Sequence, residues 1–213
     1  MNTRSRRALI LVFDRLNPGF LGPYGNTWVD TPAANRLASQ STLYEFALSN
    51  SADLTEVYHS YWTGAAPGTP IAAPSPPRSL ASVLRDLGRS SELIADDSAV
   101  LQHDAAVAFS DRLSLSIEPP TMLAGDLEQT HLAQFFAATL ERALADDAPD
   151  LLWCHSSAFN VAWDAPREFR ERFVESGDPP PLDICQPIDR DLSRDYDPDE
   201  LLGVVQAYAG QIA

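Results

Sequence analysis

The sequence predicts an α/β fold, with a mostly parallel sheet flanked by helices on both faces. Short apolar runs of strand length alternate with amphipathic helical segments along the chain. The first run, Ala8–Phe13, ends at Asp14, and parallel sheets place polar side chains just beyond the carboxyl ends of their strands. At 213 residues the chain is long enough for one good core, so we expect one domain over 1–213.

Five strands are expected, near residues 8–13, 42–48, 91–95, 113–117 and 150–155. Ala8–Phe13 is too short to span a membrane, and its unbroken apolar character predicts a strand buried on both faces. Thr31 followed by Pro32 predicts the start of a helix, Pro32–Ser39, which leads into the strand Thr42–Leu48.

Several helices follow from spacing and capping residues. Asp53 or Ser51 is expected to cap a helix whose inward side chains are Val57, Tyr61 and Trp62. Residues 65–77 are rich in Pro and Ala and predict a surface loop. Ser79 caps the next expected helix, which Gly88 ends and whose apolar stripe is Leu80, Val83, Leu84 and Leu87. Asp96 or Asp97 is expected to cap a short helix, Ser98–Ala106.

The clearest helix is Glu128–Leu144. Its expected apolar face consists of Leu132, Phe135, Phe136, Leu140, Ala143 and Leu144, with His131 solvated on another side. Residues 169–198 are acidic and Pro-rich and predict a second surface loop. A final helix is expected over Asp199–Ala213.

The net charge of −15 argues against a nucleic acid or an anionic membrane surface as partner. The basic amino terminus precedes an apolar run too short for a secretory signal, and no small-residue cleavage site follows it. The two cysteines, Cys154 and Cys185, are too few for a disulfide framework. These features predict a cytoplasmic protein with free thiols.

The first 64 residues resemble the start of a sulfatase, a member of the alkaline-phosphatase-like superfamily. The resemblance rests on LVFDRLNPGFLGPYGN, on TPAANRLA, and on residues 50–64, which align without gaps to the family's nucleophile segment. It implies the superfamily's α/β fold. Together with later segments, the resemblance covers nearly all of this chain but only about the amino-terminal half of the family's catalytic domain, so we expect an incomplete version of the fold.

Within this resemblance, the side chains at the family's catalytic positions differ from those of the family. The family's nucleophile position falls on Leu54, which can neither form an aldehyde hydrate nor attack sulfur. The family's proline and arginine positions fall on Glu56 and Tyr58. Thr55 is a less favoured substitute nucleophile, because the next turn lacks the arginine that would stabilise an oxyanion.

The resemblance also implies a calcium site. Asp14 matches the family's first ligand, whereas Arg15 stands where a second Asp belongs, and Ca²⁺ prefers six to eight oxygen ligands. We therefore expect no cofactor, calcium binding only if the family site survives, and a surface ion pair between Asp14 and Arg15.

Four further family positions lie after later strands. Asp96 and Ser98 replace a lysine and a histidine that contact sulfate in the family. His155 matches the first histidine of a later segment and Asn160 replaces the second; an Asn cannot protonate a leaving group. Beside Ser156, His155 is interpreted as a hydrogen-bonded structural residue, because adjacent strand residues point to opposite faces.

Three hypotheses remain open. The favoured one is a sulfatase-like protein that is inactive or truncated in this chain. The second is a sulfate or phosphate ester hydrolase completed by a second chain. The third is an interaction protein that self-associates, or docks a protein partner, through an unfinished sheet edge.

Overall fold

The computed structural model describes residues 7–66, 78–188 and 196–213. The chain forms two compact units, each built from segments distant in sequence. Unit 1 comprises residues 1–12, 47–116 and 135–156; unit 2 comprises residues 13–46, 117–134 and 157–213. No helix of the described part is long and apolar enough to cross a membrane. Most of the predicted 65–77 loop lies outside the described residues.

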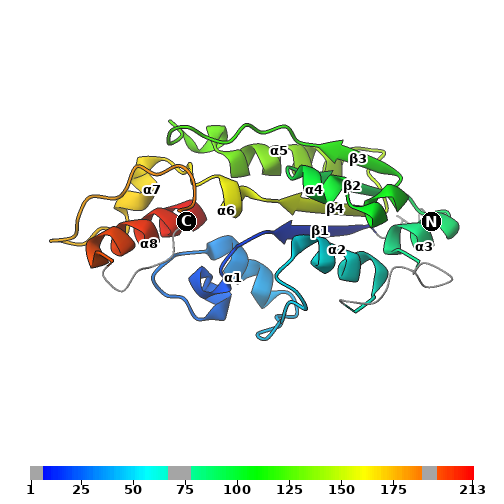
Figure 1. The fold of residues 1–213 in the computed structure, drawn as a ribbon, viewed down its shortest axis with the longest axis horizontal. Helices are drawn as coiled ribbons and strands as arrows, with labels where there is room; N and C mark the ends of the chain where they lie inside the picture. The colour runs from blue at the N-terminus through cyan, green and yellow to red at the C-terminus, as the bar shows by residue number, and fades with distance from the viewer. Residues whose placement is uncertain (1–6, 67–77, 189–195) are drawn as a thin grey trace. The chain divides into compact units, whose positions relative to one another are not determined.

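Unit 1 is built on a four-stranded sheet with the order β1-β4-β2-β3 (Figure 1). The strands are β1 (Ala8–Phe13), β2 (Ser91–Ala95), β3 (Asp111–Ser114) and β4 (Leu151–Ser156). β2 pairs in parallel with both β3 and β4. The predicted α/β class and parallel sheet are confirmed. β3 lies two to three residues before its predicted position, and β4 lies one residue after.

Both faces of the central strands are covered, as predicted. Leu93 and Trp153 point to one face, where they pack with Tyr58 and Trp62. On the other face, Arg142 of α5 (His131–Leu144) forms an ion pair with Glu92 at 2.7 Å. Residues of alternate parity on β2 and β4 therefore meet helices on opposite sides of the sheet.

β1 is the exception, because it lies at an edge of the sheet. Ile10 and Val12 pack against the core of unit 1, but Leu9 and Leu11 are 50% and 41% exposed. The prediction that Ala8–Phe13 is buried on both faces is therefore wrong. A strand at the end of the strand order has one neighbouring strand instead of two, and this leaves Leu9 and Leu11 partly exposed.

The predicted strand Thr42–Leu48 is also wrong, because these residues form no strand. Phe46 and Leu48 are 91% and 94% exposed. A strand requires a hydrogen-bonding neighbour, and no described backbone group pairs with this segment. The sequence of this segment has the apolar pattern of a strand, but the segment does not join the sheet.

The helices before β3 begin where the capping residues predict. They are α1 (Pro32–Ser39), α2 (Leu54–Thr63), α3 (Leu80–Asp86) and α4 (Ser98–Leu101). Asp53, Ser79 and Asp97 each accept a hydrogen bond from the first turn of their helix. Three details differ: Ser98–Ala106 divides into α4 and a 3₁₀ turn, Leu87 is exposed, and Tyr58 rather than Tyr61 points inward from α2.

α5 begins three residues later than predicted, after a 3₁₀ turn at Leu127–Gln129. Phe135 is fully buried, whereas Phe136, Leu140 and Leu144 are exposed, so half of the predicted apolar face does not meet the core. His131 is buried rather than solvated. Its backbone N–H donates to Asp164 Oδ2 at 2.7 Å, which fixes the start of the helix.

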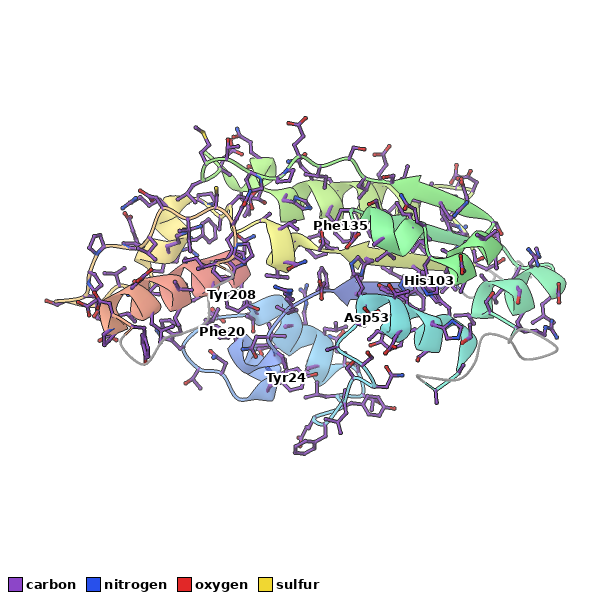
Figure 2. The ribbon with its side chains drawn as sticks, in the orientation of Figure 1. Phe20, Tyr24, Asp53, His103, Phe135 and Tyr208 are labelled. Atoms are coloured by element: carbon purple, nitrogen blue, oxygen red, sulfur yellow. The ribbon has the colours of Figure 1, made fainter. Side chains whose placement is uncertain are left out.

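Unit 2 contains α1 and three further helices: α6 (Ala158–Val161), α7 (Arg167–Glu171) and α8 (Pro198–Ile212). Tyr208 of α8 meets Phe20 edge to face, with ring centroids 4.9 Å apart (Figure 2). The final helix is confirmed. The predicted 169–198 loop starts instead inside α7, where Arg170 is fully buried; its residues 189–195 lie outside the described part.

Candidate functional site

The carboxyl ends of β2 and β4 bring polar side chains together in unit 1, as expected for neighbouring parallel strands. Asp96 directly follows β2, and Ser156 is the last residue of β4. The Ser156 hydroxyl donates to Asp96 Oδ2 at 2.9 Å, and the Asp96 N–H donates to the His155 carbonyl at 3.4 Å. The Asp96 carboxylate therefore accepts a bond from the adjacent strand, whereas Asp97 caps α4.

His155 points to the opposite face from Ser156, as the strand alternation predicts. Its ring is fully buried, and its Nδ1 lies 2.5 Å from the Tyr58 hydroxyl in a hydrogen bond. Tyr58 is itself buried and contacts the rings of Trp62 and Trp153. The hydrogen bond therefore lies inside an aromatic cluster, where a low local dielectric strengthens it.

Leu54 is the first residue of α2, and its side chain packs against the core of unit 1. Thr55 follows it with an exposed side chain. Within the described residues the Thr55 hydroxyl makes no hydrogen bond, and an activated nucleophile requires a base within hydrogen-bonding reach. The nearby Ser51 hydroxyl donates to the Glu56 carboxylate at 2.6 Å. These contacts order the start of α2 without activating Thr55.

His103, which is labelled in Figure 2, connects this same helix to the 3₁₀ turn Asp104–Ala108 through two hydrogen bonds. Its Nε2 lies 3.1 Å from the Thr55 carbonyl, and its Nδ1 accepts a bond from the Ala105 N–H at 3.0 Å. A carbonyl can only accept, so the proton of the neutral ring lies on Nε2. Burial is the main cause that lowers the pKa of His103. The neutral ring is therefore the form that this site favours.

Asp14 and Arg15 lie in unit 2, at the exit from β1. Arg15 has a φ of 58°, a left-handed conformation unusual for a side chain of its size. Its carbonyl accepts a bond from the Tyr208 hydroxyl at 2.9 Å, and the same hydroxyl accepts one from the Asn17 N–H at 2.7 Å. The expected ion pair with Asp14 is absent from the described contacts: Arg15 is exposed and its turn is held through the backbone.

Asn160 also lies in unit 2, on the short helix α6. Its N–H donates to the Ser157 carbonyl at 2.7 Å, which closes the first turn after β4. Of the predicted site residues, unit 1 thus holds Leu54, Thr55 and His155, and unit 2 holds Asp14 and Asn160.

The residues present do not fit the calcium ion that the sequence resemblance implies. Nowhere in residues 7–66, 78–188 and 196–213 do three His, Cys, Asp or Glu side chains gather closely enough to hold a metal. The left-handed Arg15 beside Asp14 adds a positive charge where a ligand would be needed.

Two residues of this site were missed from the sequence. The sequence resemblance indicates for Tyr58 only the replacement of an arginine, although Leu54, Tyr58 and Trp62 recur every four residues, a spacing that places all three on one helix face. His103 follows α4 with an Asp after it and has no local motif. Its contact with Thr55 joins residues 48 positions apart, which no local pattern predicts.

Comparisons with known proteins identify the fold. No family model matches the chain, and no curated protein matches it by sequence. Among solved structures, a phosphonate monoester hydrolase of Agrobacterium radiobacter matches with a TM-score of 0.69 at 14% identity, over 97% of this chain and 56% of that one. The carboxyl-terminal periplasmic domain of EcEptC from Escherichia coli, in complex with Zn, matches with 0.63 at 15% identity, over 98% and 56%.

A protein of the alkaline phosphatase superfamily from Vibrio parahaemolyticus matches with a TM-score of 0.52 at 12% identity, over 98% of this chain and 48% of that one. The predicted alkaline-phosphatase-like fold is therefore confirmed. At these identities the likeness concerns the fold alone. This chain spans about half the length of the solved structures it matches, so the fold is present in incomplete form.

Proposed function

We propose that this chain is a sulfatase-like protein that does not hydrolyse sulfate or phosphate esters. The observation that carries the proposal is Leu54. It occupies the position where the sequence resemblance places the nucleophile, at the first residue of α2, and its side chain packs into the core. An aliphatic side chain held in that way offers no atom that could attack sulfur or phosphorus.

Three further features support loss of catalysis. Asp14 stands beside Arg15 rather than beside a second acidic ligand. His155 is bound to Tyr58 inside an aromatic cluster, where it is shielded from a substrate. Asn160 replaces a histidine of the resembled segment and has no proton to give to a leaving alkoxide. The alkaline-phosphatase-like fold is therefore proposed to be retained without the catalytic and metal-binding side chains of the family.

The test is a calcium titration by calorimetry together with an assay of p-nitrophenyl sulfate and p-nitrophenyl phosphate hydrolysis. We expect no tight calcium binding and no turnover above buffer. Micromolar calcium affinity, or turnover that Thr55→Ala abolishes, would contradict the proposal, because either result requires a functional site around α2 or Asp14.

A second candidate is a hydrolase whose site is completed by another chain. The match to about half of the longer neighbours favours it, since the remaining half could supply ligands and a nucleophile. A metal-content measurement on protein purified from its native host separates the two candidates. Stoichiometric metal that co-purifies with this chain and a second polypeptide supports completion; metal-free protein supports the non-catalytic proposal.

The cysteines bear on where the protein functions. We propose a cytoplasmic protein, because Cys154 and Cys185 do not form a disulfide and the apolar run near the amino terminus is used as β1. Export of the intact chain fused to a reporter enzyme that is active only outside the cytoplasm would contradict this location.

A further inference from the structure

The two edges of the sheet in unit 1 differ in how they are protected. β3 forms one edge and carries two charged residues, Asp111 and Arg112, of its four. β1 forms the other edge and contains no charge, proline or glycine between Ala8 and Phe13. Charged side chains, prolines and bulges are the usual devices that prevent an edge strand from pairing with another chain. β1 has none of them.

β1 is last in the strand order, and it also carries partly exposed apolar side chains. Leu9 and Leu11 are 50% and 41% exposed, so both keep a large part of their apolar surface accessible. On the opposite side Ile10 and Val12 are anchored in the core, which holds the strand in a fixed orientation. β1 therefore presents a preformed edge of the sheet together with two partly exposed leucines on one face.

The charges that flank β1 favour an antiparallel partner of the same sequence. Arg7 precedes the strand and Asp14 follows it. A second copy that ran parallel would bring Arg7 next to Arg7 and Asp14 next to Asp14. An antiparallel copy brings the basic start of each strand to the acidic end of the other, which is the complementary arrangement.

We propose that two copies of this chain associate through β1, with the strands antiparallel and related by a two-fold axis perpendicular to the sheet. Such an axis requires a register centred on one residue, because directly opposite residues must point to the same face. Centring on Ile10 places Leu9 of each copy opposite Leu11 of the other. Both leucines lie on the same, partly exposed face, so each copy covers part of the other's exposed apolar surface.

The proposed interface does not depend on the proposal that the chain lacks catalytic activity, because β1 pairing involves neither Leu54 nor His155.

A pair of six-residue strands is smaller than a standard protein interface, so the dimer should dissociate on dilution. Native mass measured by light scattering across a dilution series should move from about one to about two chain masses as concentration rises. A strict monomer at every concentration would overturn the proposal.

Two leucine variants locate the surface. Leu11→Lys places a charge in the centre of the paired face and should shift the monomer–dimer midpoint to at least tenfold higher concentration. Leu87→Lys, at an exposed leucine after α3, is the matched control and should leave the midpoint unchanged. A dimer that persists in Leu11→Lys at the wild-type midpoint, with normal circular dichroism, would overturn the assignment to β1.

Cross-linking tests the register and does not depend on the lysine variant. In a Cys185→Ser background, Leu9→Cys and Leu11→Cys are prepared separately and oxidised alone or mixed. Opposite residues of an antiparallel pair are close enough for a disulfide. The mixture should cross-link while each variant alone should not. Cross-linking of Leu11→Cys alone would show a register centred on Leu11 and contradict the one proposed, and no cross-linking in any sample would contradict the interface.

Discussion

The Tyr58 hydroxyl lies 2.5 Å from Nδ1 of His155, and both side chains are buried in the same aromatic cluster. The contact joins α2 to the end of β4, two elements separated by 97 positions in sequence. By the sequence resemblance, Tyr58 replaces an arginine of the family, whereas His155 retains one of its histidines. In the structure the two side chains form one hydrogen-bonded pair, so the tyrosine at position 58 and the histidine at position 155 are better understood together than separately.

Removal of the Tyr58 hydroxyl should destabilise the fold. Tyr58→Phe keeps the ring but leaves a buried imidazole nitrogen without this bond, which costs about 1–3 kcal/mol of unfolding free energy. Urea denaturation followed by circular dichroism measures it. Tyr61→Phe is the matched control. Tyr61 is half exposed and its hydroxyl makes no hydrogen bond within the described residues, so removal of that hydroxyl should change the free energy of unfolding by no more than about 0.5 kcal/mol. Equal losses in both variants would contradict the role of the bond.

Stability should fall as pH drops below the ordinary pKa of histidine, because of His103. Its pKa is lowered in the folded protein, chiefly by burial. Between about pH 6.5 and the lower folded pKa, the unfolded chain binds a proton at this ring that the folded chain does not. The contribution of His103 to the free energy of unfolding is therefore fully present above about pH 6.5. It decreases as the pH falls from 6.5 to the lower pKa of the folded state. Urea midpoints measured from pH 8 to pH 5 test it.

His103→Asn is the control for that titration. An Asn side chain can still accept a bond from the Ala105 N–H, but it does not titrate. The variant should lose part of the pH dependence while remaining folded. A slope between pH 8 and pH 5 that equals that of the unsubstituted protein would assign the effect to other groups.

Local sequence signals predicted where elements begin more accurately than what they contact. Pro32, Asp53, Ser79 and Asp97 act over a few residues, and the helices begin at or beside them. Whether a face is buried depends instead on a neighbour that the local pattern does not contain. Leu9 has an apolar residue on either side of it in sequence and yet is half exposed, because its strand is at a sheet edge.

The same limit applies to the candidate site. The loss of a nucleophile at Leu54 could be inferred from residue type alone, because no environment makes an alkane nucleophilic. The buried state of His131 could not, since it depends on Asp164, 33 positions away, accepting a bond from the helix start. The bond from His103 to the Thr55 carbonyl likewise requires the folded arrangement.

The two cysteines should differ sharply in reactivity. Burial raises the pKa of Cys154 to about 11, so its thiol stays protonated at pH 8, whereas Cys185 is partly exposed. Ellman's reagent should therefore titrate one thiol in the native protein and two in urea. Cys185→Ser should remove the native signal and leave the one seen in urea. Fast reaction of the Cys185→Ser variant under native conditions would show that β4 opens readily.

Replacement of Arg15 by glycine should stabilise the protein. A left-handed conformation costs an ordinary residue about 1–2 kcal/mol, and glycine adopts it freely but loses about 0.5–1 kcal/mol more backbone entropy on folding. The expected net gain is about 0.5–1 kcal/mol in unfolding free energy. The contact that holds this turn, from the Tyr208 hydroxyl to the Arg15 carbonyl, belongs to the backbone and survives the substitution.

Arg36→Gly is the matched control, because Arg36 is an exposed arginine in the last turn of α1. Glycine within a helix is less stable than alanine by about 0.8–1.0 kcal/mol, so the free energy of unfolding of this variant should be lower. The same substitution at two exposed arginines of unit 2 should therefore change the urea midpoint in opposite directions. If both variants lose stability, the positive φ at Arg15 carries no strain, and the turn after β1 is held at its observed geometry without cost.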